Sequence, residues 1–269
     1  MKKLSKLYLA LIFIFLYSPI FVLIVFSFNT TKSRTVFEGF TLDWYEKLFN
    51  NELILTSLRN TFIIAVTASV LATVLGTAAA IGISKMKKLP RTLMMNVNNI
   101  PIINPEIVTG VSLMLLFVFF SARMNFEFGF TTLLIAHITF DVPYVVLNVL
   151  PKIRQMDPHL YEAAQDLGCS PLKAFLKVVM PEIMPGVLSG FLMSFAFSLD
   201  DFVVSYFTSG STSQTLPITI YSMTRRKVSP EINALSTIIF LVVVTVLVIK
   251  NIIERRNIKH TNVSLKEIA

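Results

Sequence analysis

The sequence predicts an all-α membrane protein with six transmembrane helices, and two observations lead to that fold class. Hydrophobic residues make up 54% of the 269 residues and charged residues only 15%, against about 25% charged in an ordinary soluble domain. The apolar residues also fall into blocks of about twenty, the length that a helix needs to cross a bilayer. The single cysteine excludes a disulfide framework, and no Cys/His cluster has the spacing of a zinc site.

The apolar blocks define the predicted spans at residues 8–28, 60–84, 92–121, 130–150, 183–206 and 234–253. The first block runs for 21 residues without a charge, longer than the apolar region of a signal peptide, so we expect a retained helix. The second is rich in Ala and Gly, which favours burial in the helix bundle. Pro101 and Pro105 break the third. We expect one transmembrane domain over 1–269, divided into 1–58 (first helix and external segment), a five-helix core (59–254) and a cytoplasmic tail (255–269).

The basic residues predict the orientation of the chain in the membrane. With the N-terminus inside, sixteen of the 24 Lys and Arg fall on inner segments and eight on outer ones. Because inner loops of membrane proteins carry the excess of Lys and Arg, both termini are predicted to be cytoplasmic. The net charge of +8 is thereby explained by topology, and no nucleic-acid partner is expected.

The inner segment 152–181 is too long for a simple turn and has the pattern of two short helices. Asp157-Pro158 combines an N-cap residue with proline at the first helical position. Gly168 is a natural C-terminal stop for that first helix. Ser170-Pro171 repeats the capping arrangement and predicts a second helix that ends at Met180-Pro181. A helix–Gly–helix element of this kind can insert into a groove on another protein.

This segment resembles the EAA loop of ABC importer permeases. The resemblance is carried by Glu162-Ala163-Ala164, by Gly168 and by the run 178–181, in which Val178 and Met180 replace the Ile and Leu that the family prefers. Four further segments resemble the permeases of spermidine/putrescine importers and extend the likeness over most of the chain: Gly39–Tyr45, Pro105–Gly110, Ser198–Phe202 and Pro230–Ala234.

The resemblance implies a division of labour among subunits. A cytoplasmic ATP-binding-cassette ATPase dimer would receive the loop, a second homologous permease would complete the pathway, and an external polyamine-binding protein would deliver substrate. The residues implied in ATPase coupling are Glu162, Ala163, Ala164, Asp166, Gly168 and Pro181. The chain has no G-x-x-x-x-G-K-[ST] phosphate loop, so it is expected to hold no cofactor and to be no enzyme, with ATP and Mg on the partner. The implied location is the bacterial inner membrane, as a multi-pass protein in contact with lipid.

Four acidic residues within the predicted spans are candidates for the substrate pathway: Glu106, Asp141, Asp200 and Asp201. Acids in a membrane are costly and usually face a cavity or a partner, and away from the span ends no Lys or Arg accompanies these. A polyamine would supply the missing positive charge. Since neighbouring residues lie about 100° apart around a helix, we expect only one of Asp200 and Asp201 to line the pathway, while the other caps a helix or pairs with the second permease.

Structural alternatives stand beside that hypothesis. The acids could carry protons or bond to polar groups such as Asn104, Thr139 or Ser198, and His137 is predicted to form an interhelical hydrogen bond.

Three other functions compete with polyamine import. An ABC permease for another solute (a phosphonate, thiamine or iron) would share the EAA-like loop. A secondary transporter would use Asp141 or Glu106 as an ion-coupling site, but the chain shows no evident inverted repeat. A membrane enzyme would need a catalytic arrangement that the sequence does not show.

Overall fold

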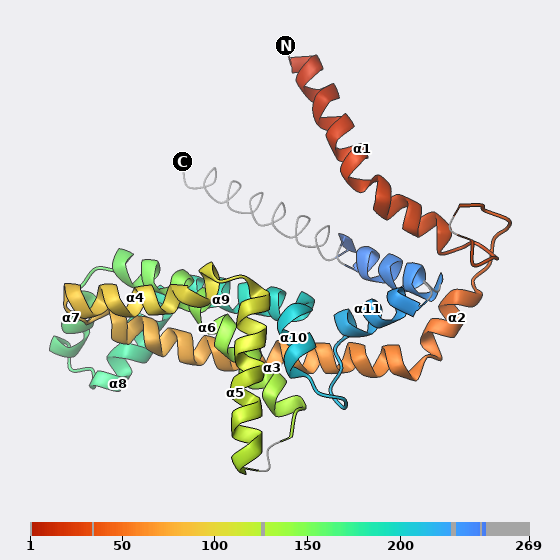
Figure 1. Ribbon diagram of the computed structural model, residues 1–269. Helices are drawn as coiled ribbons and strands as arrows, with labels where there is room; N and C mark the ends of the chain where they lie inside the picture. Colours follow the sequence, from red (N-terminus) through yellow and green to blue (C-terminus); the bar gives the residue numbers. More distant parts are fainter. Residues whose placement is uncertain (1, 34, 125–126, 227–229, 243, 246–269) are drawn as a thin grey trace. The chain divides into compact units, whose positions relative to one another are not determined.

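The computed structural model describes residues 2–33, 35–124, 127–226, 230–242 and 244–245, and these form two compact units. One unit comprises 1–52 and 222–269, and the other comprises 53–221. Figure 1 shows an architecture built from helices throughout its described part. Within the described residues, five helices are long and apolar enough to cross a membrane, which confirms the all-α membrane fold.

The first unit contains α1 (Lys2–Phe26), α2 (Asp43–Phe49) and a helix over Pro230–Val242. The loop between α1 and α2 is held by Asn29, whose side-chain amide donates to Val36 O at 2.8 Å and whose Oδ1 accepts from Glu38 N at 3.0 Å. The buried Trp44 of α2 donates from Nε1 to Asn29 O at 2.6 Å. Nine of the twenty residues of the sixth predicted span, 234–253, lie outside the described residues.

The second unit contains the remaining helices in chain order, except that Glu52 of α3 and residues 222–226 of α11 belong to the first unit. They are α3 (Glu52–Ser84), α4 (Lys88–Ile103), α5 (Glu106–Met124), α6 (Phe130–Gln155), α7 (Leu160–Asp166), α8 (Pro171–Ala174), the π-helical turn Phe175–Val179, α9 (Met180–Asp200), α10 (Val203–Thr208) and α11 (Leu216–Arg226). The predicted break in the third span lies at Asn104-Pro105, between α4 and α5. Pro101 lies inside α4.

Helices α3, α6 and α9 run alongside one another (Figure 1). Their contacts are made through small residues. A Cβ added to Gly76 of α3 would lie 2.6 Å from Val145 Cβ of α6, and one added to Gly186 of α9 would lie 2.8 Å from Asn148 O of α6. Small buried residues recur along α9 at four-residue intervals after Gly186, namely Gly190, Ser194 and Ser198. Small residues allow close backbone approach in lipid, and the second predicted span is buried along this face, while its opposite face is exposed.

The first helix and the glycine turn of the predicted helix–Gly–helix segment are present, but the second helix is longer than predicted. Asp157 Oδ1 accepts from His159 N at 2.9 Å just before α7, and Gly168 follows α7 with a φ of 86°. The predicted end of the second helix at Met180-Pro181 is wrong. Helix α8, the π-helical turn and α9 form one continuous helix over Pro171–Asp200. Pro181 lacks an amide hydrogen, and the wider turn before it, in which Met180 N bonds to Phe175 O, carries the helix past the proline.

Candidate functional site

The fifth predicted span is broken at its acidic pair. Helix α9 ends at Asp200, Asp201 is extended with φ −61° and ψ 122°, and α10 begins at Val203. The uninterrupted helix predicted over 183–206 is therefore wrong, and the argument that one helix must point Asp200 and Asp201 in different directions does not apply. Because the residues after the acidic pair are again apolar, the pattern of hydrophobicity alone gives no sign of this break.

Asp201 makes the break by capping α10. Its Oδ1 accepts from Val204 N at 3.2 Å and its Oδ2 from Ser205 N at 2.7 Å. A carboxylate at the start of a helix satisfies amide donors that have no partner within the helix and also interacts favourably with the helix dipole. The sequence spacing from Asp201 to Ser205 is the signal that could have located this cap.

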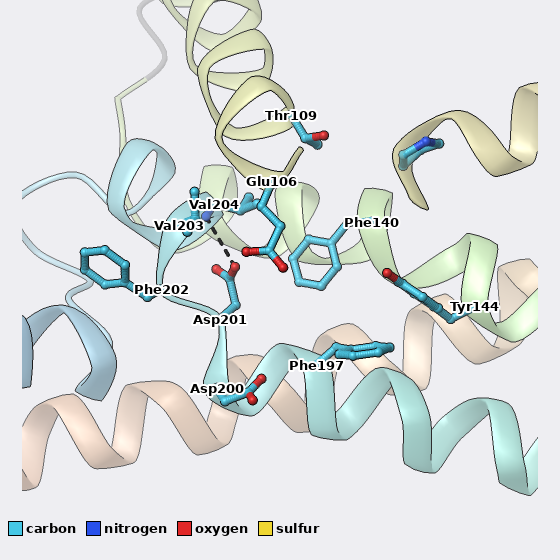
Figure 2. A pocket seen from close by; sticks show the side chains of 11 residues that line it. Glu106, Thr109, Phe140, Tyr144, Phe197, Asp200, Asp201, Phe202, Val203 and Val204 are labelled. Atoms are coloured by element: carbon cyan, nitrogen blue, oxygen red, sulfur yellow. Dashed lines mark hydrogen bonds between the residues drawn. The ribbon is translucent and has the colours of Figure 1, made fainter. Parts of the chain in front are cut away.

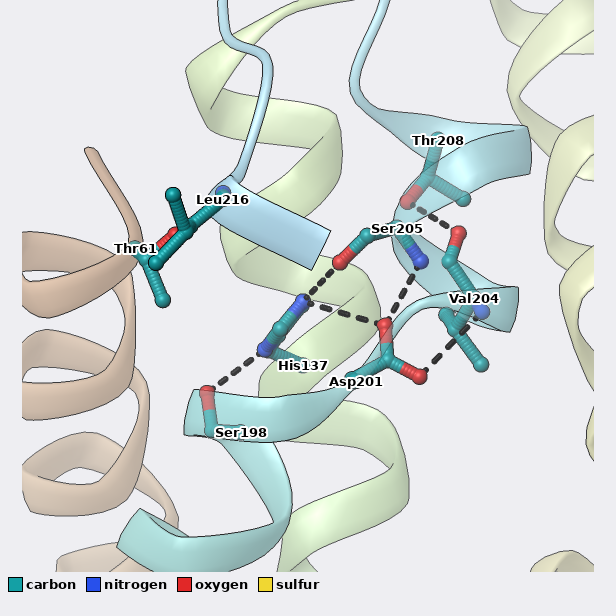
Figure 3. A network of polar contacts seen from close by, with 8 residues as sticks. All are labelled: Thr61, His137, Ser198, Asp201, Val204, Ser205, Thr208 and Leu216. Atoms are coloured by element: carbon teal, nitrogen blue, oxygen red, sulfur yellow. Dashed lines mark hydrogen bonds and ion pairs between the residues drawn. The ribbon is translucent and has the colours of Figure 1, made fainter. Parts of the chain in front are cut away.

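His137 of α6 connects the two sides of the break (Figure 3). Its Nδ1 lies 2.6 Å from Ser198 Oγ of α9, and its Nε2 lies 3.0 Å from Ser205 Oγ of α10. The same Nε2 is 3.7 Å from Asp201 Oδ2. The predicted interhelical hydrogen bond of His137 is confirmed, and through it the histidine fixes the elbow, as we call residues 201–202.

The elbow forms one wall of a cavity of about 300 Å³ (Figure 2). Three carboxylates face it: Glu106 from the start of α5, with Asp200 and Asp201 from the elbow region. Its remaining lining residues are Pro101, Thr109, Phe140, Tyr144, Phe197, Phe202, Val203 and Val204. None of the described lining residues is a Lys or Arg, so the cavity combines negative charge with aromatic surface.

The aromatic side chains of this cavity were missed by the sequence analysis. Phe140 and Tyr144 are four residues apart on α6, and the rings of Tyr144 and Phe197 lie 4.4 Å apart between centroids. Phe197 is also one turn before Asp200 and Asp201. Side chains three and four residues apart share a helix face, so this spacing around the acids was the available signal.

The fourth candidate acid, Asp141, is not among the residues that line the cavity. Its side chain is 0% exposed on α6. Neither carboxylate oxygen has a hydrogen-bond partner in the described parts of the chain. The structure therefore brings Glu106, Asp200 and Asp201 together and leaves Asp141 buried outside the cavity lining.

The residues implied in coupling lie at the other end of the long helix. Glu162, Ala163 and Asp166 are exposed on α7, Ala164 is buried, and Gly168 is exposed in the turn that follows. Pro181 lies in the first turn of α9. Glu162 Oε2 is 3.7 Å from His159 Nδ1. Leu167 is 87% exposed and Leu172 68%, so this segment presents apolar surface beside its acidic residues.

The chain resembles curated permeases over almost its whole length. It is 35% identical to the spermidine/putrescine transport system permease protein PotC of Haemophilus influenzae, over 94% of this chain and 97% of that protein. It is 34% identical to the PotC of Escherichia coli K12 over 94% of both chains. It is 37% identical to the putrescine transport system permease protein PotI of the same strain, over 84% of this chain and 82% of that protein.

Solved structures share the fold at lower identity. A bacterial ABC transporter involved in the import of the polysaccharide alginate matches with a TM-score of 0.71 and 16% identity over 94% of both chains. An amino acid ABC transporter with histidines matches with a TM-score of 0.53 and 21% identity, over 80% of this chain and 99% of that one. The profile of the family described as "binding-protein-dependent transport system inner membrane component" matches residues 72–259. By that match and by these relatives, the chain belongs to the binding-protein-dependent permeases, a family of multi-pass inner membrane transport subunits.

Proposed function

We propose that the chain is one permease subunit of an ATP-driven importer for polyamines such as spermidine and putrescine. The observation that carries the substrate class is the cavity in which Glu106, Asp200 and Asp201 meet with no basic lining residue in the described chain. The relatives, which are spermidine/putrescine and putrescine permeases, support the same substrate.

The chemistry of the cavity matches a flexible chain with several ammonium groups. Each ammonium can donate hydrogen bonds to a carboxylate, and such charge-assisted bonds replace part of the hydration that the solute loses. Ammonium groups are also attracted to the faces of aromatic rings, which Tyr144 and Phe197 supply. The aliphatic stem of a polyamine suits the apolar surface of Val203 and Phe140. An anionic solute would be repelled by this lining.

The segment over α7 and α8 is the proposed docking site for the ATPase. Its exposed Leu167 and Leu172 offer apolar surface for a groove, and Glu162 offers a charge for a basic residue of the partner. In this proposal ATP and Mg bind to the ATPase dimer, a second permease supplies the other half of the pathway, and an external binding protein delivers the solute. Both termini lie in the cytoplasm, as the distribution of Lys and Arg supports.

Transport would follow an alternating-access cycle. Closure of the ATPase dimer on ATP moves the coupling segment and exposes the cavity to the outside. The solute enters from its binding protein and its ammonium groups pair with the cavity carboxylates. Hydrolysis then returns the cavity to the inside, where the solute leaves.

Uptake of radiolabelled spermidine and putrescine by vesicles that contain the whole complex tests this proposal. ATP on the ATPase side should drive uptake. Asp200→Asn and Glu106→Gln should each raise the KM for uptake at least about fivefold, because each removes a charge that pairs with an ammonium. Glu38→Gln is the matched control, since Glu38 is exposed on the loop between α1 and α2. Uptake that ignores ATP and follows an ion gradient would overturn the importer class. ATP-driven uptake with unchanged KM in both variants would overturn the role of the cavity acids.

A further inference from the structure

Asp141 has an environment that the proposed cavity does not explain. Its side chain is 0% exposed and both carboxylate oxygens are without a hydrogen-bond partner among the described residues. Its backbone carbonyl accepts a long hydrogen bond of 3.5 Å from Ser194 Oγ of α9. Buried polar groups in proteins are nearly always hydrogen-bonded, and an acid within a membrane span normally has a partner or a function.

The neighbours of Asp141 have their polar atoms engaged elsewhere. His137, one turn earlier on α6, bonds through its two ring nitrogens to Ser198 and Ser205. Asp201 accepts from two amides of α10. No ion pair of Asp141 occurs within the described residues. The surroundings therefore supply no positive charge for this carboxylate.

Asp141 lies on α6 between two residues that line the cavity. Phe140, the preceding residue, and Tyr144, three residues later, both line the cavity. One turn before Asp141 on α6, His137 Nε2 lies 3.7 Å from Asp201 Oδ2 of the elbow. The elbow is the non-helical connection between α9 and α10. Connections of this kind are where helices can change direction with little disturbance to their hydrogen bonds.

We propose that Asp141 is an inner subsite for an ammonium group of the transported solute, closed in this conformation and reached when the elbow moves. This inference rests on the proposed function and assigns the acid a later step than Glu106, Asp200 and Asp201. The solute first pairs with the cavity carboxylates, and one ammonium group then passes to Asp141. An ammonium group suits the site better than a metal ion, because no cluster of three or more His, Cys, Asp or Glu side chains that could hold a metal occurs in the described chain.

Asp141→Asn in the complete, vesicle-reconstituted complex tests the subsite. Asparagine keeps the shape of the side chain and removes its capacity for negative charge. We expect the maximal rate of spermidine uptake to fall at least about fivefold, with KM changed less than twofold because loading uses the cavity acids. Stimulation of ATP hydrolysis by the loaded binding protein should remain. Thr77→Val is the matched control, since Thr77 Oγ1 is also buried without a partner and lies on α3, and it should leave uptake unchanged.

The outcomes separate this inference from the proposed function. Unchanged uptake by Asp141→Asn, alongside the expected effects of Asp200→Asn and Glu106→Gln, overturns the inner subsite alone, because asparagine also mimics a carboxyl group that merely holds a proton. Loss of all three effects would overturn the role of the cavity acids as well.

A second measurement applies if Asp141→Asn fails to assemble. Carbodiimide modification of Asp141 in the native complex, read by peptide mapping during ATP turnover, should decrease when spermidine is present. Modification that spermidine leaves unchanged would overturn the subsite.

Discussion

Asp201 combines two tasks in one side chain, since it faces the cavity and also caps α10 through Val204 N and Ser205 N. The two tasks depend on different properties of the carboxylate. The cap needs oxygen acceptors, of which asparagine keeps one of the two that Asp201 uses, whereas attraction of an ammonium group needs the negative charge. Substitution at this one position can therefore separate structure from transport.

We predict that Asp201→Asn lowers spermidine uptake and destabilises the complex less than Asp201→Ala does, because it keeps one of the two capping acceptors. Asp201→Ala should lower uptake and also destabilise the protein by about 1 kcal/mol, the usual cost of losing a cap. Thermal unfolding of the detergent-solubilised complex measures the second effect, and vesicle uptake the first. Equal stability of the two variants would contradict the capping role.

His137 is predicted to contribute to stability through its two hydroxyl partners. His137→Ala removes both contacts and leaves Ser198 and Ser205 buried, so we expect a loss of about 1–3 kcal/mol. Thermal unfolding against the wild-type complex measures this loss. His159→Ala, on the exposed coupling segment, is the control and should change stability by less than about 0.5 kcal/mol.

At the scale of elements, the close packing of α6 and α9 depends on glycines at positions where there is no space for a larger side chain. Gly186→Val should destabilise the protein by about 1–3 kcal/mol, the range for overpacking, because its Cβ would meet Asn148 O at 2.8 Å. Gly82→Ala on α3 should be neutral or stabilising, since a Cβ there meets nothing within 4 Å and alanine favours the helix. Thermal unfolding of the two variants side by side checks the contrast, and equal stability would contradict it.

The turn after α7 makes a different demand, on conformation rather than space. Gly168 has a φ of 86° and open surroundings, so Gly168→Ala should cost about 1–2 kcal/mol from backbone strain alone. We expect Gly168→Glu to abolish uptake while the protein remains inserted in the membrane, because it distorts and charges the proposed docking surface. Normal ATP-driven uptake by Gly168→Glu would contradict the coupling assignment.

The sequence predicts the long helices well, but it does not predict the helix break at Asp201 or the continuity of the helix through Pro181. Apolar length predicts spans such as α3 and α6 because the bilayer sets that length. The break at Asp201 and the continuity through Pro181 depend on side-chain capping and on a widened helical turn, which hydrophobicity does not register. The gathering of Glu106 with Asp200 could not be predicted, since it requires the packing of α5 against α10.

At the scale of the whole molecule, the chain carries apolar helices and no phosphate loop, so its proposed activity depends on other subunits. We predict that the tagged chain, purified in mild detergent, brings down a second permease and an ATPase in fixed proportion, and that Gly168→Glu retains the permease and loses the ATPase. Purified alone, the chain should show no ATP hydrolysis. Full uptake activity of the isolated chain would contradict this organisation.

The continuous helix from Pro171 to Asp200 joins the proposed docking segment to the acidic cavity. Its 30 residues correspond to about 45 Å at 1.5 Å per residue. A hydrogen-bonded helix of this kind is stiff along its axis. A displacement applied at Pro171 is therefore transmitted to Asp200 with little compression of the helix. The π-helical turn at Phe175–Val179 is the one place along this helix where the pitch differs from that of an α-helix. A force on the proposed docking segment would therefore reach the cavity carboxylates as a displacement of the helix, without any chemical change along its length.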